Sequence, residues 1–362
     1  MFRKNIEKSE HMNLILPAAG QSTRFPNLRP KWLLTHPNGN LMIVESIRGL
    51  DMKKIENVYV TVLQKHLDEN FVTQEGLLSA FSKIDIVPKI TVLDVATKSQ
   101  PETVYQTILQ NKISGSIFIK DVDNYFSTKI VKGNYICVQD LHDLEFVNAS
   151  NKSYVLINDK GMIDNIVEKK IISSVFCVGG YSFENSEDFI TYYEKRELAA
   201  SLFISHMVFD MILDNKIFVS KKVKDYSDWG TLNEWNKYKS DFMTVFLDID
   251  GVLLKNGSRF FSPKWEETEP LIKNIEFIKK LYATGKIYLI ITTSRKEKEV
   301  RKETIEQLRR NGIKYDQILF NLPHAQRIIV NDFTKSNPYR SCDSINIARD
   351  EESLENYFNI KE

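Results

Sequence analysis

The sequence contains little cysteine and lacks any long apolar run. Its three cysteines, Cys137, Cys177 and Cys342, lie far apart and without metal-binding spacing, so neither a disulfide framework nor a zinc site is expected. We expect buried, unreactive thiols. No apolar stretch approaches the roughly 20 residues of a membrane-spanning helix, and the polar start lacks the apolar core of a signal peptide. The sequence therefore predicts a cytoplasmic protein without a membrane partner.

The sequence also lacks an excess of either charge. Its 49 Lys and Arg residues nearly balance 48 Asp and Glu residues, which leaves a net charge of +1. No general attraction to nucleic acid is expected at that charge, so any anion must be bound by a local site. A length of 362 residues with 42% hydrophobic residues is typical of two globular domains.

A loop of small and basic residues follows a strand-like run near the start of the chain. The run is Leu14 to Leu16, and the loop and its continuation contain Ala18, Ala19, Gly20, Ser22, Thr23, Arg24 and Lys31. A glycine lets the backbone approach a triphosphate, hydroxyl and N–H groups donate to its oxygens, and the two cations neutralise its charge. The pattern predicts a site for nucleotide phosphates, with a plain strand-to-helix turn as the alternative.

Short apolar strands alternate with helical stretches through the first part of the chain. Strand-like segments at 58–63, 90–93 and 116–120 are separated by helix-like segments at 41–50 and from Pro101 onward. This alternation predicts an α/β fold whose sheet binds ligands at the carboxyl ends of its strands. Asp121 and Asp123 follow one such strand and lie on one face. Two acids beside a phosphate loop predict Mg²⁺, although an acidic turn is also common.

These elements, taken in order over roughly residues 13–238, resemble the sugar-nucleotide type of nucleotidyltransferase. The resemblance rests on the opening loop with Pro30 and Lys31, the acidic turn, the segments 165–170 and 177–183, and the segment 226–231. It implies catalysis by Arg24 and Lys31, and Mg²⁺ held by Asp123 and Asp228. It further implies nucleotide contacts from Ala18, Ala19, Gly20, Ser22, Thr23 and Gln100, and acceptor contacts from Glu168, Lys169 and Gly180.

The reaction implied by this resemblance is nucleotidyl transfer. A sugar phosphate, polyol phosphate or similar phosphomonoester attacks the α-phosphorus of a nucleoside triphosphate in line and expels pyrophosphate. The resemblance leaves both the base and the acceptor open. Gln100 at the start of a predicted helix has two interpretations, a neighbour of the base or an ordinary polar helix entry.

A second motif-bearing strand, 243–248, follows a polar junction at 233–241. Asp248, Asp250 and Gly251 close this apolar run and resemble the opening motif of haloacid dehalogenase (HAD)-like phosphatases. The resemblance implies that Asp248 is the nucleophile, that Asp250 is the general acid and base, and that both hold a Mg²⁺ ion.

Later segments extend this second resemblance. Thr293, with Thr292 close behind, stands where the family keeps a phosphate-binding hydroxyl. The apolar run 327–330 is expected to be a strand leading to a metal ligand, Asp332. The family's lysine has no clear counterpart, and Arg327 or Lys298 is expected to bind phosphate in its place.

Only about 40 residues separate Asp250 from Thr292, and they include a predicted helix at 271–282. A large cap domain does not fit there, so the second site is expected to be open, or to be closed by a second copy in a homo-oligomer. The sequence thus predicts two Rossmann-like domains with one Mg²⁺ each. They are a mixed-sheet nucleotidyltransferase domain at 12–238, after a tail at 1–11, and a capless HAD-like domain at 239–362.

The combined interpretation is a bifunctional enzyme for a precursor of a surface polysaccharide. Its expected partners are a nucleoside triphosphate and a phosphorylated sugar or polyol. Two alternatives stay open: a nucleotidyltransferase whose HAD-like domain has no activity, and a regulatory protein that only binds nucleotide. The pathway rests on family analogy alone.

Overall fold

The computed structural model describes residues 11–22, 24–25, 28–70, 72–144, 148–196, 201–332 and 341–358. The expected tail at 1–11 therefore lies outside the described residues except for His11, and so does the predicted site residue Thr23. The chain divides into two compact units, Met1–Asn236 and Lys237–Glu362. None of the helices in the described ranges has the length and apolar character that a membrane crossing requires.

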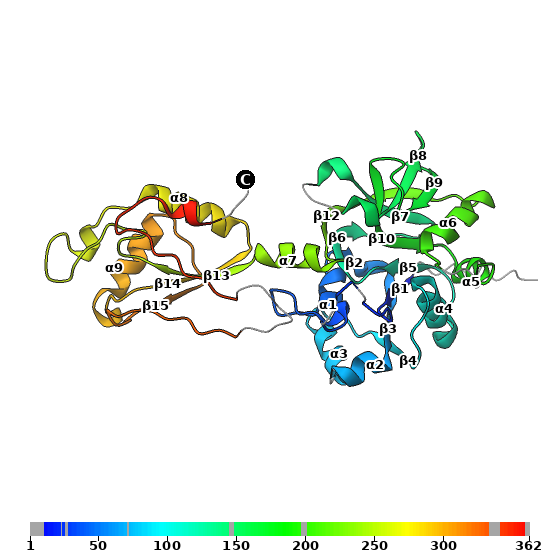
Figure 1. The fold of residues 1–362 in the computed structure, drawn as a ribbon, viewed down its shortest axis with the longest axis horizontal. Coiled ribbons are helices and arrows are strands. Elements are labelled where there is room, and N and C mark those ends of the chain that lie inside the picture. The colour runs from blue at the N-terminus through cyan, green and yellow to red at the C-terminus, as the bar shows by residue number, and fades with distance from the viewer. Residues whose placement is uncertain are drawn as a thin grey trace, which may run out of the picture. The chain divides into compact units, whose positions relative to one another are not determined.

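A nine-stranded mixed sheet forms the centre of the first unit (Figure 1). Strands β5, β1, β3 and β4 run parallel, which places their carboxyl ends at one edge of the sheet, whereas β10 runs antiparallel to its neighbours. In sheet order the strands are β11 (Val219–Lys222), β7 (Tyr135–Asp140), β10 (Val175–Phe183), β5 (Ile117–Lys120), β1 (Met12–Pro17), β3 (Ile55–Leu63) and β4 (Lys89–Leu93), with β8 (Ser153–Ile157) and β9 (Ile163–Glu168) branching from β10.

Helices cover both faces of this sheet. Because side chains alternate along a strand, Leu14 and Leu16 of β1 pack into one core with α1 and α3, while Ile15 packs into the other core with α4, α5 and α6. The structure confirms the predicted strands at 58–63, 90–93 and 116–120 and the predicted helix after Pro101, with ends that differ by up to three residues. The helices of the first unit are α1 (Met42–Ile47), α2 (Gln64–Glu69), α3 (Gln74–Ser82), α4 (Gln100–Asn111), α5 (Ser186–Glu194) and α6 (Ile204–Leu213). Helix α7 (Leu232–Ser240) begins in the first unit and ends in the second.

A small sheet lies beside the main one in the first unit. It consists of β12 (Lys224–Asp228), β6 (Asn124–Lys129) and β2 (Leu50–Asp51). Strands β12 and β6 are antiparallel, and their register places Asp228 opposite Asn124. Since Asn124 directly follows Asp123, this pairing brings two distant acidic residues together.

The second unit contains a parallel three-stranded sheet in the order β13 (Met243–Asp248), β14 (Ile287–Thr292) and β15 (Gln317–Leu319). Helices α8 (Ile272–Ala283) and α9 (Glu297–Arg310) contribute to a core that includes Val245, Leu247, Leu289 and Ile291. The expected strand at 243–248 and the expected helix at 271–282 are present, and β14 ends at Thr292, next to the predicted phosphate-binding Thr293. The site motif of this unit therefore lies at the carboxyl end of β13.

Two expectations about the second unit and the thiols are wrong. The run 327–330 forms no strand: no described strand pairs with it, and Ile328 and Val330 are 74% and 91% exposed. An apolar run becomes a strand only where a neighbouring strand accepts its hydrogen bonds, which local composition does not reveal. Cys137 and Cys177 are buried as expected, but Cys342 is exposed.

Candidate active site

The loop after β1 lines a cavity of about 520 Å³ in the first unit. Ala18, Gly20, Ser22, Arg24 and Lys31 all contribute to its wall. The Oγ of Ser22 accepts a hydrogen bond from the backbone N–H of Lys31 at 3.1 Å, which ties the loop to the short 3-10 turn Lys31–Leu33. A Cβ on Gly20 would meet no atom within 4 Å, so the backbone there faces open space.

Ala19 is placed differently from its neighbours in the loop. It is fully buried and packs with Leu63 and Leu93 in a small apolar cluster. Ala19 therefore anchors the loop to the apolar core, and it does not line the cavity. It does not line the second cavity of this unit, described below, either.

The acidic turn after β5 lies at the wall of this cavity. The Asp123 carboxylate contacts the Lys31 ammonium and lies 3.7 Å from the Arg24 guanidinium. Burial acts to raise the pKa of Asp123, but the two cations outweigh burial and hold that pKa well below its usual range. Asp123 is therefore a carboxylate at neutral pH, as a metal ligand must be.

Asp228 joins Asp123 at this point. Its Oδ1 accepts from the backbone N–H of Gly230 at 3.0 Å, and its Oδ2 contacts the Lys152 ammonium. A Cβ built on Gly230 would lie 3.1 Å from Asp228 Oδ1 and 3.4 Å from Asp123 Oδ2, so both carboxylates face one small space. Two carboxylates fit Mg²⁺, which completes its shell with phosphate oxygens and water. The described ranges contain no group of three or more His, Cys, Asp or Glu residues that could hold a metal ion.

Asp121 has a different environment from Asp123. Its Oδ1 accepts a hydrogen bond from the Gln100 amide, and its side chain lies against Gly179 of β10. Burial, reinforced by the nearby Asp123 carboxylate, raises the pKa of Asp121. Gln100 is thus held at the boundary of two cavities, both of which it lines.

The fully buried Lys120 supports the acidic turn from beneath, and sequence reasoning did not single it out. Its ammonium donates to the Asp121 backbone oxygen at 2.6 Å, and to the Asn124 backbone oxygen and Oδ1 at 3.0 and 2.6 Å. Burial lowers the pKa of Lys120 to about 8. The available signal was a lysine inside an apolar strand, because a charged group is buried only where its hydrogen bonds are satisfied.

A second cavity, of about 360 Å³, is lined by two of the three predicted acceptor residues, Glu168 and Lys169. Glu168 accepts from the hydroxyls of Ser153 and Ser205, and the Lys169 ammonium lies 4.4 Å from the centre of the Phe203 ring. Both line the cavity.

Gly180 does not line this cavity, and Gly179 does. A Cβ on Gly180 would lie 2.8 Å from the Phe126 ring and 2.9 Å from the Cβ of Cys137. Gly180 therefore permits close packing, and its neighbour Gly179 borders the cavity. Spacing in the sequence could not separate two adjacent glycines.

In the second unit, each motif aspartate is paired with an arginine. Asp248 Oδ2 lies 3.0 Å from Arg327, and Asp250 receives two hydrogen bonds, of 3.1 and 2.6 Å, from Arg295. Arg295 is 1% exposed and also donates to Thr304 and Gln307. Burial raises the pKa of Asp250, although the Arg295 guanidinium opposes this.

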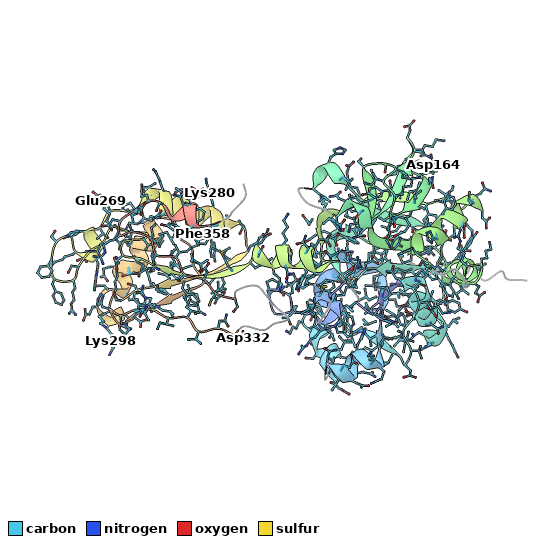
Figure 2. All side chains as sticks on the ribbon, viewed as in Figure 1. Asp164, Glu269, Lys280, Lys298, Asp332 and Phe358 are labelled. Carbon is cyan, nitrogen blue, oxygen red and sulfur yellow. The ribbon has the colours of Figure 1, made fainter. Side chains whose placement is uncertain are left out.

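Of the remaining predicted residues of this unit, the two threonines follow the strand next to Asp248, whereas Asp332 is not grouped with Asp248. Thr292 pairs with Asp248 in the β13–β14 register, and the next residue, Thr293, is buried with its Oγ1 accepting from the backbone N–H of Arg295. Asp332 is exposed and joins no metal-binding group among the described residues. Figure 2 shows Lys298 on α9, well apart from Asp332.

Comparisons with known proteins bear on the first unit. No family model matches the sequence, and no curated protein matches it. Solved structures do match. A nucleoside-diphosphate-sugar pyrophosphorylase from Vibrio cholerae RC9 is 18% identical with a TM-score of 0.52, over 62% of this chain and 98% of that one. An inositol-1-phosphate CTP transferase from T. maritima is 14% identical with a TM-score of 0.52, over 64% and 95%. The N-terminal part of the chain therefore shares its fold with these two nucleotidyltransferase structures.

Proposed function

We propose that the first unit transfers a nucleotidyl group from a nucleoside triphosphate to a phosphorylated sugar or polyol. One observation carries the proposal: Asp123 and Asp228 face one space between two cavities, with Lys31 and Arg24 beside Asp123. The cavity at the β1 loop suits the triphosphate, and the cavity at Glu168 suits the acceptor. Such an enzyme would serve the assembly of a surface polysaccharide, working in the cytoplasm where nucleoside triphosphates are made.

The residues of this chain do little covalent work in the proposed reaction. An oxygen of the acceptor phosphate forms a bond to the α-phosphorus, and the bond from that phosphorus to the bridging oxygen breaks, so that pyrophosphate leaves. Arg24 and Lys31 hold the triphosphate and neutralise its charge. Asp123 and Asp228 would hold Mg²⁺, which supplies charge stabilisation to the phosphate oxygens.

The test is pyrophosphate release with each of the four common ribonucleoside triphosphates against a panel of sugar, polyol and amino-alcohol phosphates. The variant Asp123→Asn should lose at least a hundredfold in rate, because a neutral amide is a poor ligand for Mg²⁺. The exposed Asp164, labelled in Figure 2, offers a matched control as Asp164→Asn. Triphosphate binding without pyrophosphate release from any acceptor would favour the nucleotide-binding regulatory alternative.

For the second unit we propose phosphomonoester hydrolysis in a HAD-like fold. The support is the position of Asp248 at the carboxyl end of β13, with Asp250 two residues later and Thr292 and Thr293 at the end of the neighbouring strand. A carboxylate oxygen of Asp248 would form a bond to the phosphorus as the bond from phosphorus to the ester oxygen breaks, which gives an aspartyl-phosphate, and the leaving alkoxide would take a proton from Asp250. Water would then release inorganic phosphate from the aspartyl-phosphate and restore both carboxyl groups. Arg327, whose guanidinium lies 3.0 Å from Asp248 Oδ2, would bind the phosphate group.

One observation favours the non-catalytic alternative for this unit. Asp332 does not join Asp248 and Asp250 in a metal-binding group among the described residues. Phosphate release from generic phosphomonoesters with Mg²⁺ decides between the two. An active site loses this release in Asp248→Asn and retains it in a matched control, the exposed Asp343→Asn.

A further inference from the structure

Two lysines lie on opposite sides of the paired aspartates in the first unit. Lys31 contacts Asp123 and lines the cavity at the β1 loop, whereas Lys152 contacts Asp228 and lines the cavity that contains Glu168. Neither lysine lines the other's cavity. Lys152 precedes β8 directly, and nothing in the local sequence pattern distinguishes it from a surface lysine.

We propose that Lys152 binds the phosphate group of the acceptor. The inference rests on the proposed nucleotidyl transfer and adds to it a specificity-determining residue. It assigns the acceptor cavity to a phosphomonoester, as opposed to an unphosphorylated sugar or polyol.

Lys152 is held in place for such a role. Its side chain is 14% exposed, and its ammonium lies 5.6 and 5.9 Å from the ring centres of Tyr226 and Phe176. It donates to the Tyr226 hydroxyl at 2.9 Å as well as to Asp228. These two acceptors use two of the three N–H groups of an ammonium, and the third is available to an oxygen in the cavity that the lysine lines.

The charges of the site also favour this assignment. Lys31 balances Asp123, and Lys152 balances Asp228, so the four side chains together are neutral. A phosphomonoester dianion would enter a cavity lined by the acids Glu168 and Asp121 and by the cations Arg24, Lys152 and Lys169. Among these cations, Lys152 forms the ion pair with Asp228, which holds its ammonium beside the paired aspartates.

The rival role for Lys152 is that of a counter-ion for Asp228 and nothing more. The two roles differ in what the loss of the lysine changes. A counter-ion affects the Mg²⁺ concentration at half-saturation and leaves the affinity for the acceptor unchanged. A phosphate-binding residue affects the affinity for a phosphorylated ligand and leaves the affinity for Mg²⁺-nucleotide unchanged.

The experiment is calorimetric titration of the full chain with two kinds of probe. One is each Mg²⁺-ribonucleoside triphosphate. The other, added with the best nucleotide present, is glucose 1-phosphate, glycerol 1-phosphate or inorganic phosphate, with glucose and glycerol as unphosphorylated controls. The variants are Lys152→Met, Lys152→Gln, Lys152→Arg and, as a matched control, Lys160→Met at an exposed lysine.

We expect Lys152→Met and Lys152→Gln to lower the affinity for the phosphorylated probes at least tenfold. The affinity for Mg²⁺-nucleotide should change less than twofold. Lys152→Arg should restore most of the loss, and Lys160→Met should match the wild type. Lys152→Gln guards against misfolding, since it keeps a neutral donor for Asp228 and Tyr226.

The outcomes separate the two proposals. A wild-type chain that binds no triphosphate contradicts the proposed function, whatever Lys152 does. A chain that binds triphosphate, but whose phosphorylated probes bind equally well to the wild type and Lys152→Met, overturns the assignment of Lys152. A wild type that binds nucleotide and none of the phosphorylated probes overturns it as well.

Discussion

Gly179 offers a quantitative test of how the acidic turn is packed. Its φ is +78°, and a Cβ there would lie 2.7 Å from the Cβ of Asp121 and closer still to the carboxylate. Rotation of the Asp121 side chain cannot relieve a contact with its own Cβ. The substitution Gly179→Ala therefore imposes both a strained backbone and a steric overlap beside the aspartates.

The expected cost follows from these two contributions. A left-handed conformation costs an L-residue about 1–2 kcal/mol, and forcing an extra methyl group into a packed interior costs about 1–3 kcal/mol. Gly179→Ala should thus lower the free energy of unfolding of the first unit by about 2–5 kcal/mol. It should also disturb the contact between Asp121 and Gln100.

Two other glycines separate the contributions. Gly161 has a φ of +75° and open space around a Cβ, so Gly161→Ala measures the backbone cost alone. Gly180 lies outside the left-handed region but is closely packed against Phe126, so Gly180→Ala measures the overlap alone. Urea unfolding followed by tryptophan fluorescence is a suitable assay, because the first unit contains Trp32, Trp229 and Trp235 of the four tryptophans in the chain.

The loss in Gly179→Ala should approach the sum of the other two losses. A loss in Gly179→Ala no larger than that in Gly161→Ala would refute the reasoning, since it would mean that Asp121 does not pack against Gly179. A large loss of pyrophosphate release with unchanged unfolding would instead assign Gly179 to ligand contact alone.

Three further predictions concern charge and domain structure. The pKa of Lys120 in the folded protein, about 8, is lower than its value of 10.5 in an unfolded chain. Between these values the unfolded chain binds the extra proton, so stability should rise as pH increases from 8 to 10.5, and Lys120→Met should reduce this rise in urea unfolding. Arg295→Met should destabilise the second unit by about 1.5–3 kcal/mol, because the partly buried Asp250, with a side chain 16% exposed, loses two charge-assisted hydrogen bonds; unchanged thermal unfolding would contradict this. Cutting after Ser240 should yield two soluble fragments with cooperative unfolding, and aggregation of both would contradict separate cores.

Local patterns in the sequence were sufficient for much of the fold. The strands β3, β4, β13 and β14 and helices α4 and α8 follow from apolar periodicity and a proline near a helix start, which depend on near neighbours. The Asp123 and Asp248 motifs were visible for the same reason. A strand that ends in a carboxylate places it at the ligand-binding edge of a parallel sheet.

The structure corrected the predictions that depend on distant partners. The run 327–330 has the composition of a strand but no strand beside it, and Cys342 is exposed in a chain whose other thiols are buried. Gly180 proved to be a packing glycine, and Gly179 borders the cavity. In each case the residue type suggested a strand, a buried thiol or a ligand contact, and the residues packed around it in the folded chain determined its actual environment.

The sequence by itself determined the order of elements and the type of chemistry, because hydrophobic periodicity, turn residues and motif spacing act over a few residues. Only the tertiary structure decided which charges meet. The pairing of β6 with β12 brings Asp228 to Asp123, and the approach of Lys152 to Asp228 and of Gly179 to Asp121 depends on packing between segments far apart in the chain. Electrostatic and steric interactions depend on distance in space, and distance along the sequence does not report it.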